Sequence, residues 1–293
     1  MGSAGVSRAR IYEVGPRDGL QNEKAVIPTD KKIALIDLLS DAGFDRIEAT
    51  SFVSPKWVPQ LADAEAVLAG IRRRPGVTYA ALTPNLKGFE RAVAAKADEV
   101  AIFGAASETF SQKNINCTIA ESLERFMPIM EAAERAAIPV RGYVSCVVAC
   151  PYEGAILPEA VRDVAARLLE MGCYEISLGD TIGHGTPDTV GAMLEAVLEA
   201  VPADRLAGHF HDTNNRALDN VWASLGLGLR TFDSAVGGLG GCPYAPGAKG
   251  NVSTTALAIM LAADGWETGI DMDKLAAAEA YLAKEIATVP AGE

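Results

Sequence analysis

Short apolar runs alternate along this chain with longer stretches in which apolar residues recur at helical spacing. The short runs are rich in β-branched and aromatic residues and predict strands at 10–14, 46–50, 78–83, 99–103, 140–144, 175–178, 206–211 and 231–234. The longer stretches predict helices at 30–42, 62–73, 86–96, 119–137, 158–171, 186–200, 217–227 and 252–263. One further helix is predicted at 271–288.

The ends of the predicted helices carry the expected start and stop residues. Threonine, serine and aspartate precede several of them, and Gly43, Gly172 and Gly228 follow three of them. Eight strand–helix units predict an α/β fold, a (β/α)8 TIM barrel with an additional C-terminal helical segment. An open doubly wound sheet is the alternative, but no G-x-G-x-x-G follows the first strand. We expect one catalytic domain over 1–293, with a barrel core at about 10–265 and a helical extension at about 266–293.

Composition narrows the possible partners. The 293 residues are 49% hydrophobic, which is enough for a large core, and the net charge is -12. An acidic protein is repelled by nucleic acids and anionic membranes, so we expect neither as a partner, while a local basic patch could still bind an anionic small substrate. No apolar run is long enough to span a membrane. Five widely spaced cysteines suggest reduced thiols and a cytoplasmic enzyme.

Candidate metal ligands gather at the predicted strand ends, where the active sites of such barrels lie. His209 and His211 are two residues apart on one strand, so both imidazoles face the same side. Asp18 follows the first strand, and Asn251 follows the loop after the last. Two imidazoles, a carboxylate and an amide oxygen suit octahedral Mg2+ or Mn2+ better than Zn2+, Fe2+ or Co2+. A purely structural role for the two histidines is the alternative.

Two charged residues beside this set have both a structural and a catalytic interpretation. Arg17 could form a simple ion pair in its loop, or it could stabilise an enolate or thioester oxygen. Glu48, on the second strand, could be a buried partner of Arg17, or it could orient Arg17 and a substrate hydroxyl. For Glu48 the two interpretations are compatible.

A glycine-rich segment at 237–247 carries Cys242. Such a loop can close over a substrate, and Cys242 would then be a proton donor delivered on closure. The alternative is a cysteine that only packs in an ordinary loop. The segment lacks the G-K-[ST] ending of a phosphate-binding loop.

Several motifs resemble those of the 3-hydroxy-3-methylglutaryl-CoA lyase family, and the similarity runs from about residue 10 to about 265. The matching segments are VGPRDGLQNEK at 14–24, EATSFVSPKWVPQ at 48–60, KNINC at 113–117, YVSC at 143–146, SLGDT at 177–181 and GLGGCPYAPG at 238–247. The resemblance implies metal-dependent retro-Claisen cleavage of 3-hydroxy-3-methylglutaryl-CoA to acetyl-CoA and acetoacetate. It also implies a homodimer, leucine degradation and ketone body formation.

The resemblance assigns a role to each candidate residue. It implies that Asp18, His209, His211 and Asn251 bind the metal and that Arg17 stabilises the enolate. It further implies that Glu48 and Asp180 support the metal and substrate and that Cys242 protonates the carbanion. Asp18 and His209 both stay candidates for the base.

Lys24 and Lys56 are candidate contacts for the phosphates of the acyl-CoA substrate, with simple surface solvation as the alternative. Asn214–Arg216, Lys249 and Thr255 depart from the family pattern, so cleavage of a related 3-hydroxyacyl-CoA stays open. A Claisen-type acyl-CoA synthase of the isopropylmalate or homocitrate type is a second alternative, although such enzymes carry a larger region after the barrel. A non-enzymatic binding protein is the third.

Overall fold

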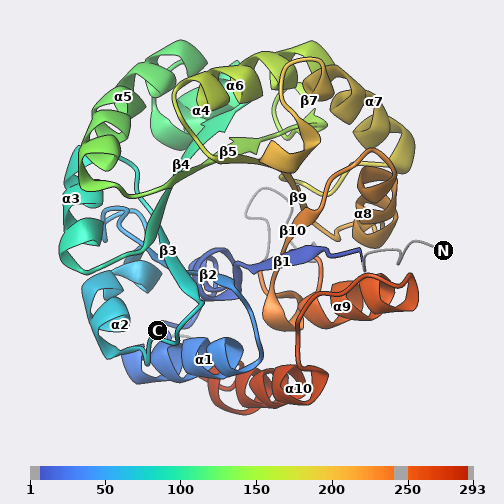
Figure 1. Ribbon diagram of the computed structural model, residues 1–293. Helices are drawn as coiled ribbons and strands as arrows, with labels where there is room; N and C mark the ends of the chain where they lie inside the picture. Colours follow the sequence, from blue (N-terminus) through green and yellow to red (C-terminus); the bar gives the residue numbers. More distant parts are fainter. Residues whose placement is uncertain (1–6, 241–249, 290–293) are drawn as a thin grey trace.

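Eight parallel strands close into a barrel in the computed structural model, which describes residues 7–240 and 250–289 (Figure 1). Around the barrel the strand order is β1-β10-β9-β8-β5-β4-β3-β2. The strands are β1 (Arg10–Glu13), β2 (Arg46–Ser51), β3 (Thr78–Leu82), β4 (Glu99–Ala105), β5 (Val140–Ser145), β8 (Glu175–Asp180), β9 (Leu206–Phe210) and β10 (Thr231–Ser234). The predicted TIM barrel is confirmed. The two ends of each predicted strand lie within two residues of the ends of the observed strand.

The helices surround the barrel as an outer ring (Figure 1). They are α1 (Thr29–Asp41), α2 (Ala64–Gly70), α3 (Leu86–Ala94), α4 (Glu108–Ile115), α5 (Ile119–Ala136), α6 (Pro158–Glu170), α7 (Pro187–Leu198), α8 (Ala217–Gly226), α9 (Thr254–Ala263) and α10 (Met272–Tyr281). Helix α2 is shorter than the predicted 62–73, because the chain turns out of the helix after Gly70. Within the described residues, none of these helices has the length and apolar character needed to cross a bilayer.

Local capping explains where several helices begin and end. Thr118 accepts a hydrogen bond from the backbone N–H of Glu121, whose side chain returns one to the Thr118 backbone, so a capping box starts α5. Gly43, Gly172 and Gly228 follow helix ends with φ of 98°, 109° and 100°. This left-handed conformation favours glycine, so these positions end helices as predicted.

Helix α4 and the two short strands β6 and β7 were not anticipated from the pattern. Helix α4 has only Phe110 and Ile115 as apolar residues, too few to show a helical period. The antiparallel pair β6 (Ala149–Cys150) and β7 (Gly154–Ala155) has strands of two residues, too short to alternate visibly. Short polar or very short segments of this kind are fixed by tertiary contacts rather than by sequence period.

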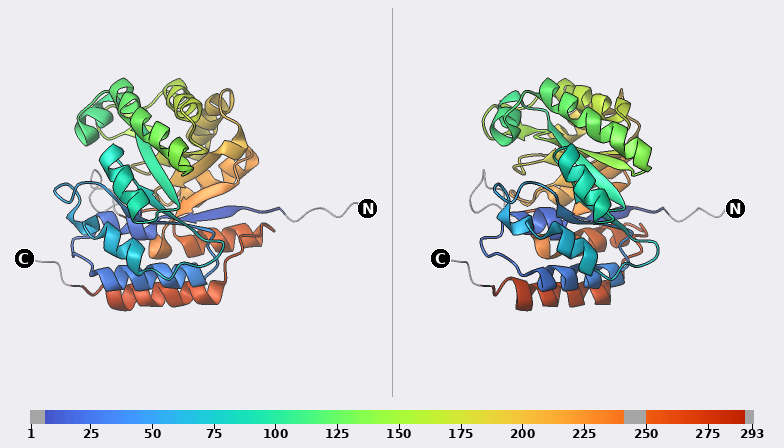
Figure 2. Two further views of the ribbon diagram at one scale, coloured as in Figure 1. Left: turned by 60° about the vertical axis from the view of Figure 1, so that its left-hand side comes forward. Right: turned by 90° about the vertical axis from the view of Figure 1, so that its left-hand side faces the viewer.

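The predicted C-terminal helical segment is confirmed and lies outside the ring of helices. Helix α10 and the π-helical turn η5 (Leu282–Ile286) pack along α1 (Figure 2). Leu275 and Ala278 are buried in this contact, and Lys31 Nζ on α1 lies 3.3 Å from Glu285 Oε2. The apolar face, with an ion pair at its edge, holds the segment against the barrel.

The interior of the barrel contains charged side chains in addition to apolar ones. Glu48 on β2, Arg141 on β5 and Asp233 on β10 are completely or almost completely buried. Barrel interiors are usually filled with branched apolar residues, and a buried charge is costly unless it is paired. These charges therefore indicate a functional arrangement, and their partners are described next.

Candidate active site

Three of the predicted metal ligands meet at the carboxyl ends of the strands. One candidate ligand atom from each of Asp18, His209 and His211 lies within 4.8 Å of the other two. Asp18 lies in the π-helical turn η1 (Gly15–Gly19) directly after β1, and His209 lies on β9. Strand β9 ends at Phe210, one residue earlier than predicted, yet the two imidazole centroids remain 5.4 Å apart. The sequence spacing thus identified a real cluster.

Asn251 reaches the cluster through the backbone. It forms an isolated antiparallel bridge with His211, so the two residues are held side by side. Its Nδ2 donates to Asp18 Oδ2 at 2.8 Å and to the Leu239 carbonyl oxygen at 3.2 Å. Its Oδ1 is buried and has no hydrogen-bond partner among the described residues. The amide is thereby oriented with its oxygen available as a fourth ligand.

The electrostatic state of the cluster suits a divalent cation. Burial would raise the pKa of Asp18, but the charges of Arg17, His209 and His211 outweigh it and hold this pKa at about 2. Burial and the charge of His209 lower the pKa of His211 to about 4. His211 Nδ1 is also buried without a partner in the described chain. A charged carboxylate, a neutral imidazole and two unpartnered polar atoms fit a bound metal ion, since buried polar atoms normally have partners.

Arg17 places a fixed positive charge at the edge of the cluster. Its Nε donates to Glu48 Oε2 at 2.6 Å, and its NH1 donates to Asp18 Oδ1 at 2.7 Å. Burial would lower the pKa of Arg17, but the charges of Glu48 and Asp18 raise it, so the guanidinium stays protonated. The predicted Arg17–Glu48 pairing is present, and it locks the guanidinium in one orientation.

A second carboxylate behind His209 was missed from the sequence. His209 Nδ1 lies 3.1 Å from Asp233 Oδ2. Burial would lower the pKa of His209, but the hydrogen bond to Asp233 and the charges of Asp233 and Asp18 raise it. In metal-binding histidines, the N–H of the second ring nitrogen commonly donates a hydrogen bond to a carboxylate. The available signal was an aspartate inside the short predicted strand 231–234, on the strand beside His209.

A buried glutamate below the cluster was also missed. Glu13 Oε1 accepts from the backbone N–H groups of Gly15 and Val236, at 2.8 and 2.9 Å. Its Oε2 accepts from Thr254 Oγ1 at 2.7 Å. Burial outweighs these hydrogen bonds and raises the pKa of Glu13 to about 7. The residue ties turn η1 to the segment after β10 and to the start of α9.

The remaining candidate residues are not among the four side chains that form the cluster. The carboxylate of Asp180 accepts from the backbone N–H groups of His184 and Gly185, at 3.1 and 2.7 Å, and so fixes the turn after β8. Lys24 and Lys56 are exposed. Cys242 and Lys249 lie in 241–249, outside the described residues. The catalytic and substrate-binding roles expected of these residues stay predictions.

The two loops that carry Lys24 and Lys56 are joined by one side chain. Gln60 Nε2 donates to the Ala25 carbonyl oxygen at 2.6 Å, and the Ile27 N–H donates to Gln60 Oε1 at 2.9 Å. The loops after β1 and β2 are therefore held side by side at the same end of the barrel.

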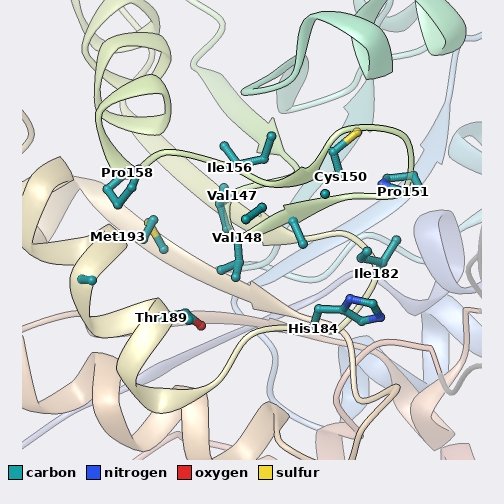
Figure 3. Close-up of a pocket in the computed structure, with 14 residues that line it drawn as sticks. Val147, Val148, Cys150, Pro151, Ile156, Pro158, Ile182, His184, Thr189 and Met193 are labelled. Carbon is teal, nitrogen blue, oxygen red and sulfur yellow. The ribbon is translucent and has the colours of Figure 1, made fainter.

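A pocket of about 560 Å3 lies between the β6–β7 hairpin and helices α6 and α7 (Figure 3). Its lining is mainly apolar, with residues such as Val148, Ile156 and Met193, and it includes the exposed His184. Among the candidate site residues that fall within 7–240 and 250–289, none lines it.

Comparison with known proteins places this geometry in a family. The HMGL-like family model matches residues 8–282. The mitochondrial hydroxymethylglutaryl-CoA lyase of Bos taurus is 59% identical over 279 residues, which cover 95% of this chain and 86% of the relative. Both matches span the barrel and the residues of the cluster.

Two solved structures of hydroxymethylglutaryl-CoA lyases are also similar to this chain. An HMG-CoA lyase from Brucella melitensis is 61% identical with a TM-score of 0.94, covering 94% of this chain and 98% of that one. An HMG-CoA lyase from Acinetobacter baumannii, in complex with coenzyme A and 3-methylmalate, is 41% identical with a TM-score of 0.92, covering 100% of this chain and 95% of that one. The chain belongs to the HMGL-like family, with hydroxymethylglutaryl-CoA lyases as its relatives.

Proposed function

We propose that this protein cleaves 3-hydroxy-3-methylglutaryl-CoA to acetyl-CoA and acetoacetate in a metal-dependent retro-Claisen reaction. The observation that carries the proposal is the convergence of Asp18, His209, His211 and the free Asn251 oxygen beside the Arg17 guanidinium. The relatives named above, all hydroxymethylglutaryl-CoA lyases, support the same activity. The coenzyme A complex of one of them supports an acyl-CoA substrate.

The bond changes define what the site must do. The C3 hydroxyl loses its proton, its oxygen becomes the ketone of acetoacetate, and the C2–C3 bond breaks. The electron pair of that bond passes to C2 and is shared with the thioester oxygen as an enolate. Protonation of C2 then gives acetyl-CoA. The site therefore needs a base near the hydroxyl, a cation near the thioester oxygen and an acid near C2.

Asp18, His209, His211 and Asn251 would hold Mg2+ or Mn2+, because their donor set contains nitrogen and oxygen and no thiolate. When bound, such an ion lowers the pKa of the C3 hydroxyl and neutralises the free carboxylate of the substrate.

Side chains of the protein would stabilise the enolate and accept the hydroxyl proton. Arg17, whose guanidinium is held by Glu48, would supply the positive charge that stabilises the enolate oxygen. Asp18 and His209 stay the two candidates for the base that receives the hydroxyl proton. Asp180 supports this region by fixing the turn after β8.

Cys242 is proposed as the acid that protonates C2. It lies outside the described residues, but the residues at both ends of its segment border the cluster. A Cβ at Gly240 would lie 2.8 Å from Asn251 Nδ2, and a Cβ at Gly250 would clash with the Gly240 carbonyl oxygen. Close approach without side chains explains both glycines and brings the two ends of the segment to the metal ligands.

Lys24 and Lys56 are proposed to attract the phosphates of the acyl-CoA. Both are exposed on loops that Gln60 holds together at the carboxyl end of the barrel strands, in a protein whose net charge is negative. Their replacement by alanine should raise KM for the acyl-CoA severalfold and reduce its dependence on salt, with kcat nearly unchanged. Lys274→Ala, on α10, is the control and should change neither value.

The proposal is tested by incubating metal-free protein with 3-hydroxy-3-methylglutaryl-CoA, with and without Mg2+ or Mn2+, and measuring acetoacetate and acetyl-CoA. We expect both products in equal amounts only when the metal is present. Absence of product from the metal-loaded protein would exclude the lyase activity. Supplying acetyl-CoA with a 2-oxo acid tests the synthase alternative through release of free coenzyme A, and analogues with a longer C3 substituent test the acyl group.

We also propose a homodimer, which is supported by the family resemblance. Sedimentation should then give twice the chain mass of 30.7 kDa. A single species at the chain mass would contradict it. The cytoplasmic location stays a prediction.

A further inference from the structure

Two arms of paired charges lie behind the metal cluster and converge inside the barrel. The first runs from Asp18 through Arg17 to Glu48, with contacts of 2.7 and 2.6 Å. The second runs from His209 through Asp233 to Arg141, with contacts of 3.1 and 2.7 Å. Each arm therefore holds one of the metal ligands from behind.

The second arm leaves Asp233 no freedom to turn. Its two oxygens accept from Arg141 NH1 and NH2 at 3.1 and 2.7 Å and from Ser177 Oγ at 2.7 Å, in addition to the His209 contact. Because Asp233 occupies Nδ1 of His209, the Nε2 atom is the one that faces Asp18, at 4.0 Å from its Oδ2. The ligand orientation of His209 thus depends on this arm.

Tyr143 on β5 is in contact with both arms. Its hydroxyl accepts from Arg141 NH1 at 3.0 Å and donates to Glu48 Oε2 at 3.2 Å. Burial and the charge of Glu48 raise the pKa of Tyr143 well above its usual value, so the hydroxyl keeps the proton that it donates. The hydroxyl is therefore the hydrogen-bonded link from one arm to the other.

The ring of Tyr143 repeats this connection. The guanidinium carbons of Arg17 and Arg141 lie 5.5 and 5.1 Å from its centroid. The His209 ring meets it edge-on, with centroids 6.2 Å apart and an interplanar angle of 84°. One aromatic side chain therefore contacts the cation of the first arm, the cation of the second arm and a metal ligand.

The two arms, together with the carboxylate of Glu175, form a network whose net charge is negative. Four carboxylates face two guanidiniums, so the network carries two negative charges in excess when both imidazoles are neutral. The carboxylates are those of Asp18, Glu48, Glu175 and Asp233, and the guanidiniums are those of Arg17 and Arg141. A bound divalent cation would balance this excess, which ties the geometry of the network to metal binding.

We propose that Tyr143 is a positioning residue that couples the two arms, so that Asp18 and His209 keep the separation a metal ion requires. The inference rests on the metal site of the proposed function. Loss of the hydroxyl leaves each arm with its own ion pairs, because Arg141 keeps Asp233 and Arg17 keeps Glu48. The two ligands can then move independently, which weakens metal binding without emptying the barrel interior.

The test measures Mn2+ binding to the full chain without substrate, by electron paramagnetic resonance of the free ion. We expect Tyr143→Phe to raise the Mn2+ Kd about three- to tenfold, and Asp233→Asn to raise it about 10- to 100-fold. The matched control is Tyr174→Phe, because the Tyr174 hydroxyl donates to the buried Glu99 at 3.0 Å, away from the cluster. We expect the control to stay within about twofold of the unmodified protein.

Equal Kd values for Tyr143→Phe and Tyr174→Phe would overturn the proposal, as would a parent protein that does not bind Mn2+. The double variant Tyr143→Phe/Asp233→Asn adds a second criterion. If Tyr143 acts on His209 through this network, the Kd of the double variant rises by less than the product of the two single effects. Fully multiplicative effects would show that Tyr143 acts independently. Mn2+ binding is read without lyase turnover, so a failure of the proposed reaction and a failure of this inference give different results.

Discussion

Asn251 donates from Nδ2 to Oδ2 of Asp18 at 2.8 Å, although the two residues are 233 positions apart in the sequence. This hydrogen bond fixes the amide so that Oδ1 has no partner in the described chain. It also joins turn η1, after the first strand, to the segment that follows the last strand of the barrel. The metal site is therefore completed only when the barrel has closed.

Asn251→Ala should raise the Mn2+ Kd at least about tenfold, because it removes one ligand oxygen and the donor that orients Asp18. Asn220→Ala is the matched control, since Asn220 is also buried and its Nδ2 donates to the Gly185 carbonyl oxygen at 3.1 Å. The control should lose stability but keep its Kd. Unchanged Mn2+ binding by Asn251→Ala, measured by calorimetry, would remove Asn251 from the ligand set.

Arg17→Lys should reduce kcat about 100-fold while Mn2+ binding falls far less. A lysine keeps the charge but cannot donate to Glu48 and Asp18 from two rigidly separated nitrogens, so the cation is no longer fixed beside the enolate. Arg46→Lys is the control, because Arg46 also pairs with a buried glutamate, Glu99, outside the cluster. Similar kcat losses in both variants would reduce the role of Arg17 to general stability.

The sequence predicted the strands and most helices because short apolar runs alternate with longer stretches of helical spacing, several of which begin with a capping residue. It also predicted that Asp18, His209 and His211 meet, since the carboxyl ends of the strands gather at one end of a barrel. It could not predict the contact of Asp233 with His209 or the position of Tyr143 between two guanidiniums. Those contacts depend on which strands are neighbours and on which faces turn inward, as in the pairing of Asp233 with His209 across β10 and β9.

Cys242→Ser should reduce kcat at least about 100-fold and leave the Mn2+ Kd within about twofold of the parent value. A serine hydroxyl is a much weaker acid than a thiol, so protonation of C2 becomes slow, while the four proposed metal ligands are unchanged. Cys173→Ser is the control, because Cys173 is buried in the core. Near-normal turnover by Cys242→Ser would exclude the thiol as the proton donor.

Glu13 should make the free energy of unfolding depend on pH. Burial raises its pKa in the folded protein from 4.5 to about 7, so the folded state holds the proton more tightly than the unfolded chain. The stabilisation is complete below the unfolded pKa and is lost as the pH rises through about 7. The expected loss between about pH 5.5 and about pH 8.5 is about 2 kcal/mol.

Glu13→Gln isolates this contribution from that of other acidic groups. The amide oxygen can still accept from Gly15 and Val236, and the amide nitrogen can donate to Thr254, but the side chain no longer titrates. Urea unfolding of both proteins over this pH range should therefore give curves that converge toward low pH and separate toward high pH, with the glutamate form falling more steeply. Parallel pH dependences would mean that Glu13 ionises in the folded protein as easily as in the unfolded chain, with its three hydrogen-bond donors stabilising the carboxylate fully.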